Sequence, residues 1–326
     1  MKRVPRHTIV FRIDLFPFEI SVVAARARRL GAVLHYRHED LPSKSLFRSQ
    51  STGEMRCSRG LPIPRRNPTS RTKVLVTGST GLLGRALRRE LSKDPEIDLV
   101  QTGFSRAEKA GMVRLNLLDG DSVRETLERE RPQLVIHAAA ERRPDVSEKD
   151  PDGTRALNID ATGALAGVAA SVGADTLYLS TDYVFDGAEP PYRPDAMPNP
   201  LNFYGESKLA GEVAVRDATE RHVVLRVPVL YGQVETLDES PVTVIAKGLL
   251  GLNATSTPEP QKQDHWATRY PTLTDDIAFV CAQIARRCGE ESPLRGTFHW
   301  SGDEPFTKYE MARIICELWE LPHEGL

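Results

Sequence analysis

The chain has 326 residues, of which 40% are hydrophobic, and it carries a formal net charge of −2. This length is sufficient for one large α/β unit, or for a nucleotide-binding domain with a smaller lobe. No stretch approaches the roughly 20 uninterrupted apolar residues that a membrane-spanning helix needs. We therefore expect a soluble, cytoplasmic protein.

The charge is unevenly distributed along the chain. Residues 1–71 contain 15 basic and 5 acidic residues, whereas residues 72–326 contain 28 basic and 40 acidic residues. An acidic body is a poor candidate for nonspecific nucleic-acid binding, so neither nucleic acid nor a membrane is expected as a partner. The spacings of the four cysteines match neither a zinc site nor a disulfide framework, and no metal is expected.

Residues 1–71 form a divergent N-terminal extension that we predict to be disordered. Its composition is rich in arginine, serine and proline, and its apolar stretch Ile9–Val23 is interrupted by Asp14, Pro17 and Glu19. Such a stretch is a poor secretory segment. An organelle transit peptide, which the two acidic residues disfavour, and an alternative start of the chain are the other interpretations.

From Lys73 onward, short apolar runs alternate with helical patterns. The predicted strands are Lys73–Thr77, Asp98–Gly103, Gln133–His137, Thr176–Ser180 and His222–Val227. The predicted helices are Leu82–Leu91, Asp121–Glu130 with Asp121 or Ser122 as its cap, Ala156–Ser171 and Tyr204–Ala218. Strands that alternate with helices imply a parallel sheet with right-handed crossovers. The predicted fold class is therefore α/β, a doubly wound parallel sheet of the Rossmann type.

The C-terminal third of the chain is less regular. Amphipathic helices are predicted at Asp275–Arg287 and Lys308–Leu321. Between Pro241 and Pro271 lies an irregular region that contains the polar, proline-rich segment Thr255–Gln263. We predict that the nucleotide-binding domain begins at residue 72 and that residues from about 232 to 326 form a small α+β substrate lobe.

A glycine-rich turn after the first predicted strand is the main sign of a dinucleotide site. Gly78-Ser79-Thr80-Gly81-Leu82-Leu83-Gly84 has the pattern G-x-x-G-x-x-G between a strand and a helix. Glycines permit a tight turn and let the backbone approach a diphosphate, while the helix N-terminus supplies N–H groups and partial positive charge. A purely structural turn is the alternative, which the strand-turn-helix context disfavours.

The end of the second predicted strand favours NADP over NAD. An acidic residue there would bond the ribose of NAD, but the sequence Gly103-Phe104-Ser105-Arg106 has no carboxylate. Arg106 is expected to pair with a 2′-phosphate, unless it is a solvated loop residue. The loop Asn116–Asp119 is expected to flank the adenine. Small residues after His137 let the cofactor pass close to the strand end, and His137 itself is predicted to be structural.

The pattern Y-x-x-x-K at Tyr204 and Lys208 predicts a reductase-type proton-transfer site. Positions i and i+4 share one helix face, so the lysine is expected to lie beside the phenol and to lower its pKa from about 10. Such a tyrosine can pass a proton to a carbonyl oxygen during hydride transfer. Thr181, or Ser180, is expected to bond the same carbonyl. A pair on the helix surface is the alternative.

Several segments resemble known families. The turn 78–84 with LSTDYVFDG (179–187), YGESK (204–208) and RVPVLYG (226–232) resembles the dTDP-4-dehydrorhamnose reductase branch of the extended short-chain dehydrogenases/reductases. A closer resemblance, over about residues 72–323, is to the regulatory β subunits of methionine adenosyltransferase II. It rests on AAERRPDV (139–146), ALNIDATGALA (156–166), NFYGESKLAGE (202–212), PTLTDDIA (271–278) and GTFHWSGDEPFTKYEMA (296–312).

This resemblance implies a non-catalytic, NADP-binding subunit of S-adenosylmethionine synthetase. Such a subunit associates with the catalytic α2 subunit, which makes S-adenosylmethionine from methionine and ATP, and modulates its kinetics. The family continues past a point like Leu321-Pro322 with a tail that docks on the catalytic subunit. We therefore expect this chain, which stops at Leu326, to be truncated, and its binding to that subunit to suffer.

Two other interpretations remain open. The chain is an active NADPH-dependent reductase of a nucleotide-sugar carbonyl if Thr181, Tyr204 and Lys208 are its catalytic set. A paralogue that binds no nucleotide is the third, and the intact glycine turn disfavours it.

The predicted cofactor contacts combine the turn and the lysine with positions that the resemblance transfers. They are Gly78, Thr80, Gly81, Leu82, Leu83, Gly84, Phe104, Ser105, Arg106, Asn116, Leu117, Ala138, Arg142, Tyr204, Lys208 and Leu230.

Overall fold

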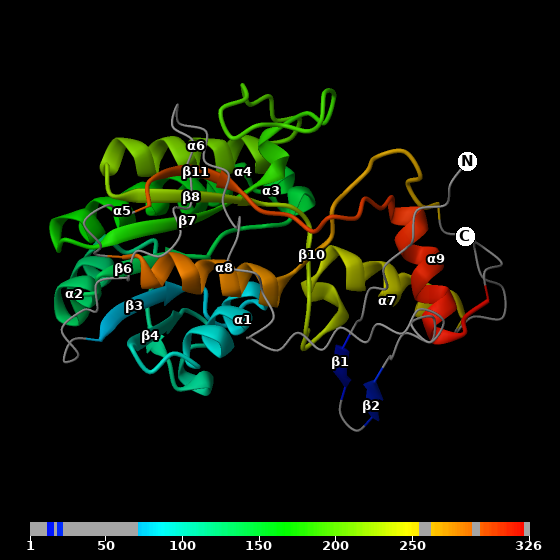
Figure 1. The fold of residues 1–326 in the computed structure, drawn as a ribbon, viewed down its shortest axis with the longest axis horizontal. Helices are drawn as coiled ribbons and strands as arrows, with labels where there is room; N and C mark the ends of the chain where they lie inside the picture. The colour runs from blue at the N-terminus through cyan, green and yellow to red at the C-terminus, as the bar shows by residue number, and fades with distance from the viewer. Residues whose placement is uncertain (1–11, 16–17, 22–70, 254–261, 289–293, 323–326) are drawn as a thin grey trace, which may run out of the picture. The chain divides into compact units, whose positions relative to one another are not determined.

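A computed structural model describes residues 12–15, 18–21, 71–253, 262–288 and 294–322 (Figure 1). These residues divide into two compact units. One unit lies within Arg65–Tyr231 and Arg269–Pro305, and the other within Met1–Pro64, Gly232–Thr268 and Phe306–Leu326. In the part of the chain that the structure describes, no helix has the length and apolar character needed to cross a bilayer.

A seven-stranded parallel sheet forms the centre of the first unit. Its strand order is β11-β8-β7-β6-β3-β4-β5. The strands are β3 (Thr72–Thr77), β4 (Ile97–Gly103), β5 (Val113–Arg114), β6 (Leu134–His137), β7 (Asp175–Thr181), β8 (His222–Val227) and β11 (Gly296–His299). All residues of β6 and β7 are buried, as expected for strands with helices on both faces. The predicted fold class is confirmed.

Helices cover both faces of this sheet (Figure 1). On one face, α2 (Gly120–Glu130), α5 (Ala161–Ser171) and α6 (Phe203–Ala218) bury a core that includes Leu75, Val135 and Leu165. On the other face, α1 (Leu82–Leu91) packs against α8 (Thr274–Arg286). The shorter elements of this unit are η2 (Glu108–Ala110), α3 (Pro144–Lys149), α4 (Pro151–Arg155), η3 (Ala156–Asp160), η4 (Asp182–Val184), β9 (Leu230–Tyr231) and β10 (Thr272–Leu273).

The order of the strands creates a switch point between β3 and β6. From β3 the chain proceeds through β4 to β5 at one edge, and β6 then returns to the other side of β3. In open α/β sheets, ligands bind outside the carboxyl ends of the strands at such a point. The glycine turn that follows β3 and Ala138, which follows β6, both lie there.

Two predicted helix starts differ from the structure. The side chain that caps α2 is that of Asp119, which accepts N–H groups from Asp121 and Ser122. The two residues that were predicted as caps therefore lie inside the first turn, and their backbone N–H groups donate to the side chain of Asp119. The predicted helix Ala156–Ser171 starts with the π-helical turn η3, and the α-helix itself begins at Ala161.

The predicted lobe, residues 232–326, is not one continuous unit. Arg269–Pro305 belongs to the sheet unit, because β10, α8 and β11 pair or pack with its elements. The second unit contains η5 (Leu237–Glu239), α7 (Pro241–Asn253) and α9 (Lys308–Trp319). Within the predicted extension 1–71, β1 (Arg12–Leu15) pairs antiparallel with β2 (Phe18–Ser21). Nearly all of that extension lies outside the described residues, so its predicted disorder stays a prediction.

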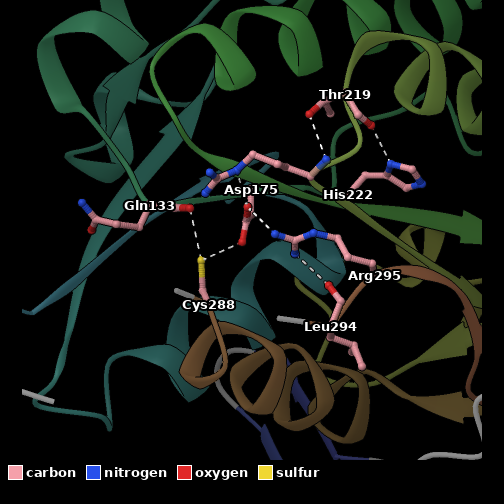
Figure 2. A network of polar contacts seen from close by, with 8 residues as sticks. Gln133, Asp175, Thr219, His222, Cys288, Leu294 and Arg295 are labelled. Carbon is pink, nitrogen blue, oxygen red and sulfur yellow. Dashed lines mark hydrogen bonds and ion pairs between the residues drawn. The ribbon is translucent and has the colours of Figure 1, made fainter. Parts of the chain in front are cut away.

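Asp175, at the start of β7, ties late segments of the chain to the sheet (Figure 2). Its carboxylate is buried, and one oxygen accepts from Arg221 Nε at 2.8 Å and from Arg295 Nη2 at 3.0 Å. The thiol of Cys288 lies 3.3 Å from the other oxygen and 3.2 Å from the carbonyl of Gln133. The carboxylate thus joins β7 to the residues that follow α8 and precede β11.

We expect the substitution Asp175→Ala to lower the free energy of unfolding by about 2–4 kcal/mol, because two guanidinium groups lose a buried acceptor. Denaturant unfolding of the two proteins measures this difference. Asp195→Ala is the matched control, since the ion pair of Asp195 with Arg193 is exposed on both sides. The control should change stability by less than about 0.5 kcal/mol. Equal effects of the two substitutions would contradict the stabilising role of the buried Asp175 carboxylate.

Candidate functional site

The turn after β3 lies directly against the segment after β6. Gly78 has φ +69°, and a Cβ added there would lie 2.9 Å from the backbone nitrogen of Ala139. The hydroxyl of Thr77 accepts the N–H groups of Ala138 and Ala139 at 3.2 and 3.3 Å. Only glycine permits both this backbone conformation and this close approach.

The N-terminus of α1 offers backbone N–H groups to an anion. The helix starts at Leu82 after Gly81, with no side-chain cap and no acidic residue in its first turn. Arg85 is buried, and its Nη1 donates to the carbonyl of Thr80 at 3.0 Å, which fixes the turn. Amides at a helix start attract negative charge, so a diphosphate suits this position.

The residues that follow β4 and β5 lie at the same edge of the sheet. Phe104, Ser105 and Arg106 are all exposed, and the guanidinium carbon of Arg114 lies 5.4 Å from the centroid of the Phe104 ring. Asn116 and Leu117 follow β5 and are partly buried. The protein thus presents aromatic, cationic and polar side chains here, which suit a planar base and a phosphate group of a ligand.

The structure brings the predicted hydroxyl and phenol together. Thr181 ends β7, Tyr204 lies in the first turn of α6, and the Thr181 hydroxyl is close enough to the phenol to lower its pKa. The Thr181 hydroxyl also lies 3.2 Å from a carboxylate oxygen of Asp182. Ser180, the alternative to Thr181, instead donates to Glu212 at 2.6 Å. Of the two candidates, Thr181 is therefore the one that reaches the phenol.

The environment of Tyr204 opposes ionisation of its phenol. Burial, together with the negative charge of Asp182, raises the pKa of Tyr204 well above its usual value, while Thr181 and Arg142 oppose this rise. The prediction that Lys208 lowers this pKa is therefore wrong for this structure. The shared helix face is present, but the ammonium group is directed elsewhere.

Lys208 extends into the protein interior toward β7. Its Nζ donates to the carbonyl oxygen of Leu179 at 2.8 Å and lies 4.0 Å from the centroid of the Tyr178 ring. Burial lowers the pKa of Lys208 to about 7, and the charge of Glu212 opposes this shift. The sequence pattern did not reveal the Tyr178 contact, although a tyrosine within a buried strand is a signal that could have suggested it.

Asp182 is a site residue that the sequence patterns did not indicate. Its side chain contacts solvent, yet protein surrounds the carboxylate densely enough that burial raises its pKa to about 6. The hydrogen bond from Thr181 and the charge of Arg269 oppose this rise. Its position directly after a strand-end hydroxyl was the available signal.

The remaining predicted residues occupy separate positions. Arg142 is exposed and close enough to affect the pKa of Tyr204, and Leu230 pairs with Thr272 between β9 and β10. The ring nitrogens of His137 lie 2.8 Å from the hydroxyl of Thr77 and 3.0 Å from that of Thr162. Burial lowers the pKa of His137 to about 3, so it is a neutral structural residue, as predicted.

A buried ion pair supports the loop that follows η4. Arg226 donates to both carboxylate oxygens of Glu212, at 2.8 and 2.6 Å. Its Nη1 also lies 3.2 Å from the carbonyl of Pro194 and 3.3 Å from Nε2 of His299. One guanidinium group thus connects α6, β8, β11 and the loop.

Comparisons with known proteins agree with this architecture. Residues 72–325 match the family model described as RmlD substrate binding domain. The chain is 46% identical over 254 residues to methionine adenosyltransferase 2 subunit beta of Bos taurus, which covers 78% of this chain and 74% of the relative. It is 31% identical over 251 residues to a dTDP-4-dehydrorhamnose reductase of Sinorhizobium fredii, covering 76% and 78%.

A solved structure of a reductase has a similar fold. The crystal structure of dTDP-4-dehydrorhamnose reductase from Bacillus anthracis in complex with NADP matches with a TM-score of 0.66 and 27% identity, over 78% of this chain and 84% of that one. The chain therefore belongs to the RmlD substrate binding domain family, in the branch that contains the β subunits of methionine adenosyltransferase 2.

Proposed function

We propose that this chain is a non-catalytic, NADP-binding regulatory subunit of a methionine adenosyltransferase that modulates the kinetics of the catalytic α2 subunit. The observation that carries the proposal is the 46% identity to the Bos taurus β subunit over 254 residues. At 31%, identity to the Sinorhizobium fredii reductase is markedly lower.

The geometry around Tyr204 supports a role without catalysis. A reductase of this type needs a phenol that exchanges its proton near neutral pH. Here burial and Asp182 hold the pKa of Tyr204 high, and the ammonium of Lys208 is bonded to Leu179. The set therefore suits ligand binding better than proton transfer.

The residues at the strand ends suit NADP. The amides of α1 accommodate a diphosphate, and the segment after β4 offers Arg106 and no carboxylate to a 2′-phosphate. The buried ammonium of Lys208 has donor capacity for ribose hydroxyls. When bound, NADP would supply a hydride acceptor, but in this proposal it serves to complete the fold of the subunit.

The test is to mix the purified chain with the catalytic α2 subunit and NADPH. We expect co-elution in size-exclusion chromatography and a change of about twofold or more in the methionine KM. A twofold change corresponds to a coupling free energy of about 0.4 kcal/mol between the two subunits. The Bacillus anthracis reductase, which shares the fold, is the matched control and should do neither. Absence of both effects, with this chain and again with the chain extended by the C-terminal tail of a β subunit, would overturn the proposal.

An active reductase is the second candidate, favoured by the proximity of the Thr181 hydroxyl to the phenol of Tyr204. NADPH absorbance is followed with dTDP-4-dehydrorhamnose as substrate. Turnover that the substitution Tyr204→Phe abolishes would establish this activity, and oxidation no faster than background would exclude it for this substrate.

A further inference from the structure

Lys208 is a buried cation with few partners. Only 3% of the surface of Lys208 is exposed. Its ammonium group has three N–H donors. One donor is directed to the carbonyl of Leu179 at 2.8 Å, and the face of the Tyr178 ring lies 4.0 Å from Nζ. No carboxylate forms an ion pair with Nζ in residues 71–253, 262–288 or 294–322.

Three titratable groups surround this ammonium, namely His137 on β6, Tyr178 on β7 and Glu212 on α6. Burial keeps His137 neutral by lowering its pKa to about 3, and burial raises the pKa of Tyr178 well above the usual value. Glu212 is already bonded to Arg226 through both oxygens.

We propose that Tyr178 is a positioning residue that holds the Lys208 ammonium on its ring face and thereby couples NADP binding to the uptake of a proton. This inference rests on the proposed cofactor. The ribose hydroxyls of the cofactor supply the acceptors that the ammonium lacks. The proton comes from solvent, binds to the neutral amine of Lys208 and remains on it in the complex.

The direction of the coupling follows from the surroundings of Lys208. Burial lowers its pKa to about 7, so a growing share of the chains carries a neutral amine as the pH rises above that value. Hydrogen bonds to the charged form raise the pKa when the ligand binds. The affinity for NADPH is therefore highest below pH 7 and declines as the pH rises above that value. In the range above pH 7, binding of NADPH is accompanied by proton uptake.

The ring of Tyr178 sets where this window lies. A buried cation–π contact stabilises the ammonium by an amount that corresponds to about one pKa unit. The hydroxyl of Tyr178 makes a long contact of 3.5 Å with the backbone carbonyl of Lys208 and interacts with Thr162, so it does not reach the ammonium. The ring, and not the hydroxyl, is therefore the part of the side chain that matters for the lysine.

Calorimetric titration with NADPH, in buffers of different ionisation enthalpy between pH 7 and 9, counts the protons taken up. The 2′-phosphate adds none there, because the second pKa of a phosphate monoester is about 6. The wild-type chain should take up more than half a proton at its maximum. In Tyr178→Leu the pH of maximum uptake should fall by about one unit, whereas Tyr178→Phe should leave it unchanged.

Lys208→Met and Lys208→Arg, each checked for folding by circular dichroism, are the controls. Both should bind NADPH more weakly than the wild type, and the binding that remains should show no proton uptake. Saturable binding to the wild type with no proton uptake would overturn the role of Tyr178 while leaving the cofactor intact. An equal shift in Tyr178→Phe and Tyr178→Leu would also overturn it. Absence of binding at millimolar NADPH would overturn the proposed cofactor and this inference together.

Discussion

Replacement of Gly78 by alanine is expected to weaken NADPH binding by at least about 100-fold, or about 2.7 kcal/mol. The added methyl group would lie 2.9 Å from the backbone nitrogen of Ala139, at a residue with φ +69°. The turn must therefore move away from the segment after β6, and the amides of α1 move with it. Fluorescence titration of the variant with NADPH measures the loss.

Gly167→Ala is the matched control for this prediction. A Cβ at Gly167 meets nothing within 4 Å, and the residue lies inside α5. Alanine there should leave NADPH affinity unchanged and raise the free energy of unfolding by up to about 1 kcal/mol. If Gly78→Ala bound NADPH as tightly as Gly167→Ala, the turn would not be the diphosphate site.

Replacement of Glu212 by alanine is expected to lower the free energy of unfolding by about 3–5 kcal/mol. Glu212 is fully buried, and its removal leaves the guanidinium of Arg226 without a counter-charge. The hydroxyl of Ser180 loses its acceptor as well. Denaturant unfolding, with the midpoint and the slope both determined, measures the loss.

Two further variants test the origin of that loss. Asp217→Ala changes an exposed carboxylate on the same helix and should alter stability by less than about 0.5 kcal/mol. The double variant Glu212→Gln with Arg226→Met removes both charges and should recover part of the stability. A double variant that is less stable than Glu212→Ala would show that the unpaired charge is not the cause.

The central strands were predictable because their residues are apolar and β-branched over several positions. Lys73–Thr77 and His222–Val227 lie in β3 and β8 almost as predicted. The helix Leu82–Leu91 was predicted with its observed bounds, since the glycine turn marks its start. Periodicity and turn residues are local signals, and these elements depend mainly on local signals.

β11 and the cap of α2 were not predicted, each for a physical reason. The sequence of β11, Gly296–His299, is four residues long and contains no aliphatic run, so only its pairing with β8 makes it a strand. The cap Asp119 follows a short loop, and two later residues, Asp121 and Ser122, have equally suitable side chains. Local composition does not distinguish such candidates.

The spacing of Tyr204 and Lys208 indicated a shared helix face but not the direction of the ammonium. That direction depends on Tyr178 and Leu179, which come from a strand that is distant in sequence. The importance of Asp182 depends in the same way on Thr181 and Arg269. Charge states in a site are set by tertiary neighbours, and a motif does not contain them.

The late position of β11 has a consequence for biosynthesis. β8 ends at Val227, but its outer neighbour begins only at Gly296. While the ribosome makes the intervening residues, β8 exposes an unsatisfied row of backbone amides and carbonyls to other nascent chains. Chaperone binding during translation should therefore be strongest in that interval and should end when β11 emerges and closes the edge.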